Sequence, residues 1–444
     1  MLIRFTIDNW LSFAETTELS MVASPERQHN ERVARVKSYA KILPMAAVYG
    51  GNASGKTNFF QALNFVQRLV VHGRKPDSPI PVTPFLLDPE KPGAPSSFTL
   101  EICVDGTFYE YGFTLTHKEV LKEHLIRIGQ TTERVLFQRE GRTVEFHRSL
   151  PEQKYLQFVA RGTRENQLFL TNSVFQNLQT FEAVYIWFKD HLEMVAPDAR
   201  FELFEILSDK DSIFSDQVNT LLEQMDTGIK RLDTEEVAFK DLPFSAAVKS
   251  QIQEELQEGK TLRIDGSMNA RFLVSRKQGE IRAKKLISYH HAPDGGEVRF
   301  ELSQESDGSQ RLIDLLPAFV SLMAADCTKV FVIDELDRSL HSLLTKKLLE
   351  LYLESCSPET RKQLILTTHD LSLMDQSLLR RDEMWVTQRK SDGSSQLFSF
   401  SEFKDVRYDK DIRKSYLQGR LGGVPVLDRV GEEPLSYDPS GSKN

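Results

Sequence analysis

Residues 50–57 read Gly-Gly-Asn-Ala-Ser-Gly-Lys-Thr, and they match the phosphate-loop pattern G-x-x-x-x-G-K-[ST] at every fixed position. A short apolar run over 42–49 precedes the loop and predicts a strand, whereas 58–70 has the apolar spacing of a helix. In a strand–loop–helix unit, the loop N–H groups and the helix N-terminus face one point, where they bind phosphate. A chance glycine-rich turn is the alternative, and the flanking strand and helix argue against it.

Each residue type in the loop has a physical reason. Gly50, Gly51 and Gly55 let the backbone bend tightly and present its N–H groups. Lys56 supplies a mobile positive charge for the outer phosphates of a nucleotide, and Thr57 offers a hydroxyl to Mg²⁺. The loop therefore predicts a binding site for a nucleoside triphosphate with Mg²⁺.

The bulk composition is that of an ordinary globular protein. The chain has 444 residues, of which 40% are hydrophobic and 27% charged, and this length predicts about two to four domains. No apolar run approaches the ~18 residues that span a membrane. The first residues alternate like a strand rather than a signal peptide, and the cysteines lack metal or disulfide spacing. We therefore expect a cytoplasmic protein without a membrane partner.

Charge limits the choice of partners. The net charge of −8 argues against a protein that coats DNA through its bulk charge, but it leaves room for a local basic groove. Two basic clusters favour a solvated face over a nucleic-acid contact. They comprise Arg32, Arg35, Lys37 and Lys41, and Arg276, Lys277, Arg282, Lys284 and Lys285.

The pattern along the chain predicts an α/β protein. An antiparallel pair over 2–20 leads to the phosphate loop, 73–96 reads as loop, and 97–147 predicts an antiparallel β lobe with turns at Asp105-Gly106 and Glu140-Gly141. Helical periods dominate 152–260 without coiled-coil heptads, and strands return over 261–302. Strands then alternate with helices to residue 387, which implies a parallel sheet covered on both faces.

These shifts divide the chain into four predicted parts. The first two are 1–150, which holds the phosphate loop and the β lobe, and 151–300, a helical insertion followed by returning strands. The others are 301–430, a C-terminal half with the remaining site residues, and 431–444, a disordered tail.

Two later strands end in residues that suit nucleotide chemistry. The apolar run over 330–333 ends in Asp334, which suits Mg²⁺, and Glu335, which suits polarisation of an attacking water. A core strand that merely ends in surface charges is the alternative, and the upstream phosphate loop disfavours it. The strand over 363–368 ends in His369, which can reach a γ-phosphate, although a lone histidine at a strand end is more often structural.

A second anion cradle is predicted where a helix begins near residue 309. The run Ser306-x-Gly308-Ser309-Gln310 places a hydroxyl and small residues at that helix start. A plain N-capped helix is the alternative, but it would need only one serine.

The order of these elements resembles that of ABC-type ATPases in the RecF and SMC group: phosphate loop, Q-loop, Ser-Gly-Gln signature, acid strand, D-loop and switch histidine. The loop with Asn52, Ser54 and Asn58 is similar to the SMC/RecF form, and the signature over 305–311 lacks the double glycine of transporters. The opening over 5–13 and the run over 412–425 are similar to small AAA15-type ATPases related to RecF and to OLD nucleases.

The resemblance covers 1–70 and 295–427 and reaches 98–300 only in outline. It implies an ABC-type P-loop ATPase head with a mixed sheet, an antiparallel β lobe and a helical insertion. It also implies that ATP and Mg²⁺ bind at the phosphate loop. The nucleotide contacts would then be Gly50, Asn52, Ser54, Gly55, Lys56, Thr57 and Asn58, with Lys56, Glu335 and His369 catalytic.

Thr57, Asp334 and a Q-loop glutamine would hold the metal. Gln176, within 169–177, is the candidate for that glutamine, because Gln61 and Gln67 fall inside the helix after the loop. The resemblance further implies that the signature completes the site of a second molecule, so that two chains enclose two ATP molecules. The residues at that interface would be Ser306, Gly308, Ser309, Gln310 and Asp337.

Three functions follow from the resemblance. The favoured one is a sensor or regulatory ATPase of a bacterial antiphage system, similar to the ATPase subunits of PARIS-, retron- or Septu-type systems, which controls a separately encoded nuclease, possibly of TOPRIM type, or a toxin. The alternative is a RecF-like ATPase that contacts DNA in repair or recombination. A transporter subunit is disfavoured by the insertion, the β lobe and the signature.

Overall fold

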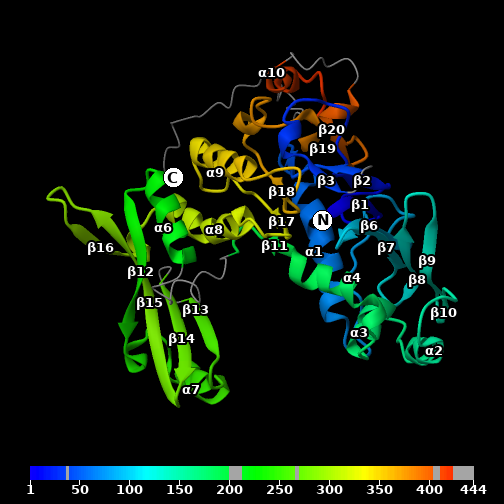
Figure 1. Cartoon of the computed structure of the whole chain (residues 1–444), viewed down its shortest axis with the longest axis horizontal. Helices are drawn as coiled ribbons and strands as arrows, with labels where there is room; N and C mark the ends of the chain where they lie inside the picture. Colours follow the sequence, from blue (N-terminus) through cyan, green and yellow to red (C-terminus); the bar gives the residue numbers. More distant parts are fainter. Residues whose placement is uncertain (37–39, 200–212, 266–269, 404–410, 424–444) are drawn as a thin grey trace, which may run out of the picture.

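The computed structural model describes residues 1–36, 40–199, 213–265, 270–403 and 411–423. The predicted tail over 431–444 lies outside these residues. The described chain forms three main sheets and the helices that pack on them (Figure 1). The α/β architecture expected from the sequence, with a mixed sheet and an antiparallel β lobe, is confirmed.

A six-stranded sheet carries the phosphate loop. Its strand order is β11-β17-β18-β5-β19-β20, and every pair is parallel except β19 with β20. Side chains of the loop strand alternate between two cores, because Ala46 and Val48 pack in one and Met45, Ala47 and Tyr49 in the other. This two-sided burial is typical of a parallel sheet. The strands are β5 (Met45–Tyr49), β11 (Leu192–Val195), β17 (Val330–Ile333), β18 (Gln363–Thr367), β19 (Met384–Arg389) and β20 (Ser395–Ser399).

Helices cover both faces of this sheet. Helix α1 packs with the β lobe in one core, whereas α8 and α9 pack in the other. The phosphate loop connects β5 to α1, and Gly55, with φ 114°, turns the chain into the helix. The helices are α1 (Lys56–His72), α2 (Gln153–Arg161), α3 (Phe169–Phe175), α4 (Glu182–Ile186), α6 (Ile213–Gln224), α7 (Ala246–Glu255), α8 (Asp307–Met323), α9 (Ser342–Glu354) and α10 (Ile412–Leu417).

The predicted antiparallel β lobe is confirmed as a seven-stranded sheet of order β10-β9-β8-β7-β6-β1-β2. Its first hairpin turns at Asp105 and Gly106, with φ of 48° and 73°, which are the positive values that a two-residue turn requires. Residues 73–95 contain no helix or strand, as predicted. The strands are β1 (Leu2–Asp8), β2 (Thr17–Ser20), β6 (Ser96–Val104), β7 (Thr107–Leu115), β8 (Val120–Ile128), β9 (Glu133–Glu140) and β10 (Thr143–Phe146). The strands β3 (Ala34–Val36) and β4 (Ala40–Ile42) form a separate two-stranded sheet.

The third sheet forms a separate lobe, with α7 packed on it (Figure 1). Its strand order is β12-β15-β14-β13, and β16 also pairs with β15. The four returning strands predicted over 261–302 are therefore confirmed. The strands are β12 (Ile229–Val237), β13 (Thr261–Asp265), β14 (Arg271–Lys277), β15 (Glu280–His291) and β16 (Glu297–Glu301).

Two local features differ from the sequence prediction. Helices dominate the described part of 152–260, as predicted, but two strands there were not predicted: β11 extends the central sheet beside β17, and β12 joins the third sheet. Residues 10–13, inside the antiparallel pair predicted over 2–20, do not start its second strand. They form a tight turn in which the N–H groups of Trp10 and Phe13 each donate to the other residue's carbonyl at 2.8 Å.

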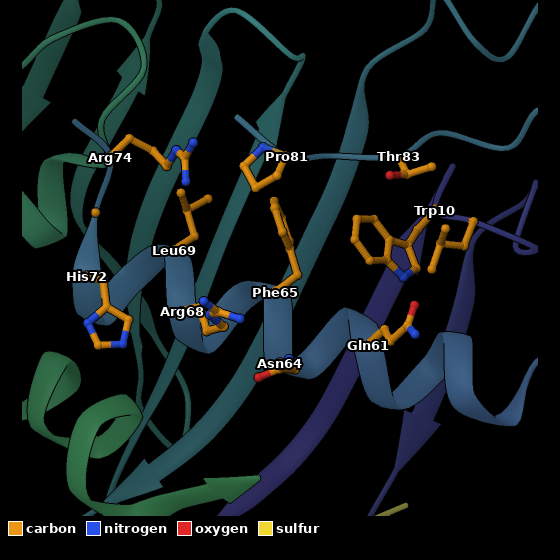
Figure 2. Close-up of a pocket in the computed structure, with 12 residues that line it drawn as sticks. Trp10, Gln61, Asn64, Phe65, Arg68, Leu69, His72, Arg74, Pro81 and Thr83 are labelled. Atoms are coloured by element: carbon orange, nitrogen blue, oxygen red, sulfur yellow. The ribbon is translucent and has the colours of Figure 1, made fainter. Parts of the chain in front are cut away.

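A groove of about 540 Å³ runs along the outer side of α1, which we call the α1 groove. Figure 2 shows Arg68 and His72 on the helix, with Pro81 across from it and Trp10 at one end. The floor of the groove is apolar, because the rings of Phe65 and Trp10 line it and are almost fully buried. The groove is thus a hollow with cationic side chains above an apolar base.

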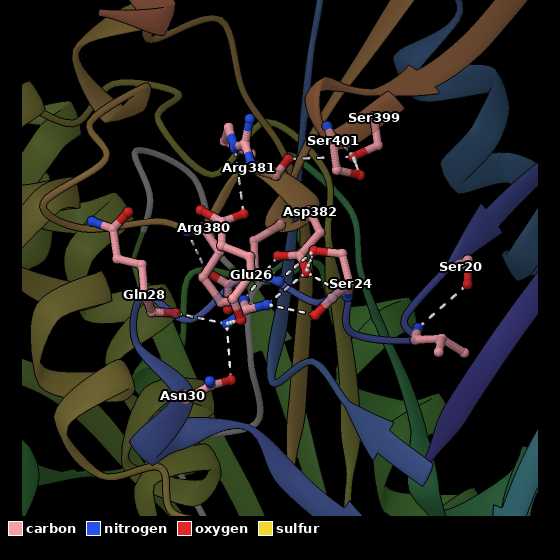
Figure 3. Close-up of polar contacts among 12 residues, drawn as sticks. Ser20, Ser24, Glu26, Gln28, Asn30, Arg380, Arg381, Asp382, Ser399 and Ser401 are labelled. Atoms are coloured by element: carbon pink, nitrogen blue, oxygen red, sulfur yellow. Dashed lines mark hydrogen bonds and ion pairs between the residues drawn. The ribbon is translucent and has the colours of Figure 1, made fainter. Parts of the chain in front are cut away.

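Buried ion pairs and hydrogen bonds connect the residues just before β19 to the N-terminal part of the chain (Figure 3). Arg380 binds both carboxylate oxygens of Asp382 at 2.8 Å and donates to the Gln28 carbonyl at 2.6 Å. The same carboxylate accepts from the N–H and the hydroxyl of Ser24 at 2.7 Å. Such bidentate arginine contacts fix geometry, so this network holds the segment around 24–28 against the central sheet.

Candidate nucleotide site

The phosphate loop is bent where glycine is required. Gly50 has φ 151°, and a Cβ atom there would lie 2.5 Å from Ser54 Oγ and 2.6 Å from the Thr387 carbonyl oxygen. At Gly55 a Cβ atom would lie 2.5 Å from Ser395 Oγ. Neither position can hold a side chain without displacing the loop. The sequence prediction that these glycines shape the loop therefore agrees with the backbone.

Lys56 occupies the centre of the loop. Its Nζ donates to the carbonyls of Gly50 at 2.8 Å and Gly51 at 3.0 Å, and it lies 3.4 Å from His369 Nδ1. Burial lowers the pKa of Lys56 to about 8, although Asp334 and Glu335 oppose this shift. The lysine is therefore a desolvated cation whose hydrogen bonds are to its own loop, and phosphate oxygens can take the place of those carbonyls.

The side chains of two residues expected at the nucleotide also support the loop. Ser54 Oγ lies 2.6 Å from Thr387 Oγ1 on β19, and Thr387 in turn donates to the Tyr49 carbonyl. Asn58 Nδ2 donates to Ser12 Oγ at 2.8 Å, which binds the loop helix to the turn after β1. Asn52 is exposed at the tip of the loop. The side chain of Ser54 thus rigidifies the cradle from behind.

Asp334 is the best candidate for a metal ligand. It is fully buried at the end of β17, and its Oδ1 accepts from the Thr367 hydroxyl at 2.5 Å. Within the described part of the chain, its Oδ2 has no hydrogen-bond partner. Burial raises the pKa of Asp334, whereas the hydroxyls of Thr367 and Thr57 lower it. A buried carboxylate oxygen without a partner, beside a threonine hydroxyl, fits the hard oxygen ligands that Mg²⁺ prefers.

Glu335 is held in an unusual backbone conformation. Its φ is 49°, in the left-handed region that side chains other than glycine seldom adopt. Its N–H donates to Thr367 Oγ1 at 2.8 Å, so one hydroxyl fixes both Asp334 and Glu335. Backbone strain of this kind costs about 1–3 kcal/mol and persists where neighbouring contacts impose it. Thr367 was missed from the sequence, although it lies two residues before His369.

His369 and Asp337 meet at the same edge of the sheet. The His369 N–H lies 3.2 Å from an Asp337 carboxylate oxygen. Burial, followed by the charge of Lys56, lowers the pKa of His369, so its ring favours the neutral form. A neutral ring beside a lysine can accept as well as donate a hydrogen bond. In this chain Asp337 therefore orients the backbone of the histidine.

The signature residues lie at the start of α8. Ser306 is exposed, and its Oγ accepts from the Ser309 N–H at 3.1 Å as the helix cap. Gln310 is buried and donates to the Glu305 carbonyl at 2.9 Å. A Cβ atom at Gly308 would lie 2.8 Å from the Ser339 carbonyl, so α8 closely approaches the turn that follows Asp337. The exposed N-terminus of α8 can face a second molecule.

Glu305 ties this segment to the third sheet. Its Oε1 accepts from Ser288 Oγ at 2.5 Å and lies 2.7 Å from His290 Nε2. Both partners are on β15, and the carboxylate is buried. The position of the signature is thus linked directly to β15.

A family model matches residues 45–375, and its description reads "AAA domain, putative AbiEii toxin, Type IV TA system". The chain belongs to this family. The matched residues include the phosphate loop, the acid strand and the histidine at the end of β18, so family and site agree on an ATP-binding ATPase. No curated protein sequence matches the chain.

Two solved structures are distant neighbours of this AAA-family chain. The SMC head domain from Thermotoga maritima shares 12% identity at a TM-score of 0.37, over 90% of this chain and 98% of that chain. An SMC head bound to the C-terminal winged-helix domain of ScpA shares 13% identity at a TM-score of 0.40, over 90% and 97%. The assignment rests on the family match and on the site geometry.

The Q-loop prediction is wrong. Gln176 is exposed at the end of α3, where its carbonyl accepts from the Tyr155 hydroxyl at 2.7 Å. Helix α3 packs at the far end of α1, since Thr171 Oγ1 donates to the Val70 carbonyl at 2.7 Å. Helix α1 rises about 1.5 Å per residue, so its ends are roughly 25 Å apart. Gln176 therefore cannot reach a metal at Thr57.

The end of β11 and the segment after it lie beside the acid strand and α8. Asp334 donates its N–H to the Val195 carbonyl at 3.0 Å, so β11 ends beside the acid strand. Arg311 of α8 reaches this point and donates to the Ala199 carbonyl at 3.3 Å. Burial lowers the pKa of Arg311, whereas Asp314, Asp198 and Glu335 oppose that effect. Sequence reasoning missed β11, because this strand is only four residues long, and it assigned no role to Arg311.

Three residues of the two basic clusters form ion pairs. Arg32 is buried and lies 2.6 Å from Glu383, and Lys285 lies 2.5 Å from Glu301. Arg282 pairs with Glu280 at 3.7 Å, while Lys37 lies outside the described residues. Among the residues that the structure describes, no cluster of three His, Cys, Asp or Glu side chains suits a metal, and no helix is long and apolar enough to cross a membrane.

Proposed function

We propose that the chain is a Mg²⁺-dependent ATPase that dimerises around ATP and regulates a separately encoded effector in an antiphage system. The observation that carries the ATPase proposal is the gathering of Lys56, Asp334, Glu335 and His369 at the carboxyl ends of three adjacent strands. Ligands of parallel α/β sheets bind at that edge. The position of the signature supports the dimer, and the family description supports the effector.

Each side chain has a part in hydrolysis. Lys56 leaves its loop carbonyls and binds the outer phosphates, while Thr57 and Asp334 would hold Mg²⁺. Bound Mg²⁺ neutralises the charge that develops on the phosphate oxygens. Glu335 accepts a proton from the attacking water, and His369 orients that water and the γ-phosphate. Thr367 keeps the two carboxylates in place.

The proposed dimer is supported by the position of the signature. Ser306 is exposed, and among the residues that the structure describes its hydroxyl bonds only within the start of its own helix. Helix α8 has 17 residues, and its N-terminus is a partial positive charge that favours phosphate. We infer that this end binds the ATP held by a second copy, so that Ser306, Gly308 and Ser309 complete the partner's site, with Asp337 near the interface.

The experiment measures ATP turnover per molecule against protein concentration, together with the sedimentation of a Glu335→Gln protein with ATP. We expect turnover per molecule to rise with concentration, and the Glu335→Gln protein to form a stable dimer. Ser306→Arg should lose both properties, whereas Ser303→Arg, a nearby exposed control, should keep them. Turnover that is flat with concentration and unaffected by Ser306→Arg would refute the dimer.

The regulatory role is supported by the family description, which names a toxin and a toxin–antitoxin system. A protein of this role needs an effector encoded elsewhere, and a TOPRIM nuclease or a toxin gene next to its own gene would support the proposal. The RecF-like alternative predicts instead that duplex DNA strongly stimulates ATP turnover and that salt removes the stimulation. Measuring turnover with and without duplex DNA distinguishes the two.

A further inference from the structure

The α1 groove is basic in a protein that is acidic as a whole. Arg68, His72 and Arg74 line it, and none of the described lining residues is Asp or Glu. The sequence explains this, because no acidic residue occurs between Glu31 and Asp77 in a chain of net charge −8. Within the described part of the chain, the exposed Arg68 guanidinium has neither a hydrogen bond nor an ion pair. The groove therefore attracts carboxylate or phosphate groups.

Three exposed aromatic side chains, which we call the aromatic ridge, lie next to this groove. Tyr155, Phe158 and Phe175 are 40%, 70% and 51% exposed. The rings of Tyr155 and Phe158 are stacked, with centroids 6.3 Å apart and an angle of 11° between their planes. Large rings held rigid on a surface are common anchors of protein interfaces.

The groove and the ridge form one continuous surface. Gly73 lines the groove, and a Cβ atom at Gly73 would lie 3.9 Å from a ring carbon of Phe175. The Tyr155 hydroxyl reaches the carbonyl of Gln176, the residue after Phe175, at 2.7 Å. A ligand that extends along the groove past Gly73 can therefore also contact Phe175 of the ridge.

We propose that this surface binds an acidic segment of a partner protein that carries apolar side chains. Its carboxylates would pair with Arg68, His72 and Arg74, and its apolar groups would pack on the aromatic ridge. Exposed charges of both signs lie on the helices of the ridge, with Glu152, Lys154 and Arg161 at or on α2 and Glu182 at the start of α4. The apolar faces of the ridge suit Leu and Phe side chains, and the net charge of −8 disfavours binding to nucleic acid, so the chemistry favours a protein segment.

This inference deepens the proposed function, since it locates where an effector would dock. Arg68, His72 and the aromatic ridge lie toward the far end of α1 from Lys56, so docking there does not require the nucleotide site to be occupied. ATP turnover and docking can therefore be measured separately.

The test is the fluorescence anisotropy of a short labelled peptide that alternates Glu with Leu and Phe, titrated with the full chain. Comparison probes are a peptide that alternates Glu with Ser, one that alternates Lys with Leu and Phe, and a single-stranded oligonucleotide. We expect the Glu/Leu/Phe peptide to bind most tightly and added salt to weaken it. Arg68→Glu and Phe158→Ala should each weaken binding about tenfold.

Two matched variants control for charge and for exposed apolar area. Arg413→Glu alters another exposed arginine, and Leu343→Ala another side chain that is 70% exposed; both should bind as the unmodified chain does. ATP turnover should be unchanged in Arg68→Glu and Phe158→Ala. If the unmodified chain has no turnover, the proposed function fails while the peptide result stands.

Several results would overturn the inference. They are the absence of Glu/Leu/Phe peptide binding at about 1 mM, equal binding of the Lys peptide, and full affinity in Arg68→Glu. Tighter binding of the oligonucleotide, lost in Arg68→Glu, would assign the surface to nucleic acid instead. Nucleotide-independent self-association that Arg68→Glu abolishes would assign it to a second copy of the chain.

Discussion

Replacement of Thr367 by valine tests how the two catalytic carboxylates are positioned. The side chain is 1% exposed at the end of β18, and valine matches its shape. The hydroxyl donates to Asp334 at 2.5 Å and accepts from the Glu335 N–H at 2.8 Å. Valine removes both bonds, and it leaves the strained φ of 49° at Glu335 without its hydrogen bond.

The expected loss can be estimated from these two bonds. A hydrogen bond to a charged group contributes about 1.5–3 kcal/mol, and a neutral one about 1 kcal/mol. We therefore expect Thr367→Val to lower the free energy of unfolding by roughly 2–4 kcal/mol. If about 2 kcal/mol of this positioning is specific to the transition state, kcat falls roughly 30-fold. The Mg²⁺ requirement should also rise, because the Thr367 hydroxyl lowers the pKa of Asp334.

Urea unfolding and steady-state ATP turnover measure the two effects. Thr345→Val is the matched control, since Thr345 is also fully buried, and the one bond of its hydroxyl to a described residue is long, 3.5 Å to the His341 carbonyl. Thr367→Ser restores the hydroxyl and should recover most of kcat. Unchanged kcat in Thr367→Val, or an equal loss in Thr345→Val, would refute the role assigned to this hydroxyl.

Three further outcomes are expected. The affinity for ATP, measured by calorimetry, should fall as the pH rises above about 8, because Lys56 has a pKa of about 8 in the empty site and bound phosphates favour its charged form; a constant affinity up to pH 9.5 would contradict this. Arg139→Met should lower the free energy of unfolding by about 3–5 kcal/mol in urea, because it leaves the buried Glu123 carboxylate without its cation. Gln176→Ala should leave ATP turnover unchanged, and a loss would restore it as a site residue.

Residues of fixed chemistry could be predicted from the sequence. The phosphate loop is recognisable because its geometry demands Gly50, Gly55 and Lys56 at set positions. Asp334 and Glu335 are recognisable because two acids at the end of an apolar strand have few structural explanations. The antiparallel β lobe was predictable for a similar reason, since strict alternation and Gly turns are local signals.

Features that depend on distant pairing could not be predicted. The strand β11 is four residues long within a helical region, and it exists because β17 pairs with it. Thr367 looks like any β-branched strand residue until β18 is placed next to β17. Gln176 failed for the same reason, because the sequence gives no sign of which end of α1 receives the α3 helix.

The contact of Glu305 with β15 couples the third sheet mechanically to the signature at the start of α8. β15 has 12 residues, and such a strand spans roughly 40 Å. One carboxylate joins this arm to the residue before Ser306. A force applied to the outer hairpin, which β14 and β15 form, would therefore be delivered, through Ser288 and His290, to the N-terminus of α8, which we propose binds the nucleotide of a second copy. Sequence change in the remote hairpin can alter the ATP cycle while every residue that touches ATP stays the same.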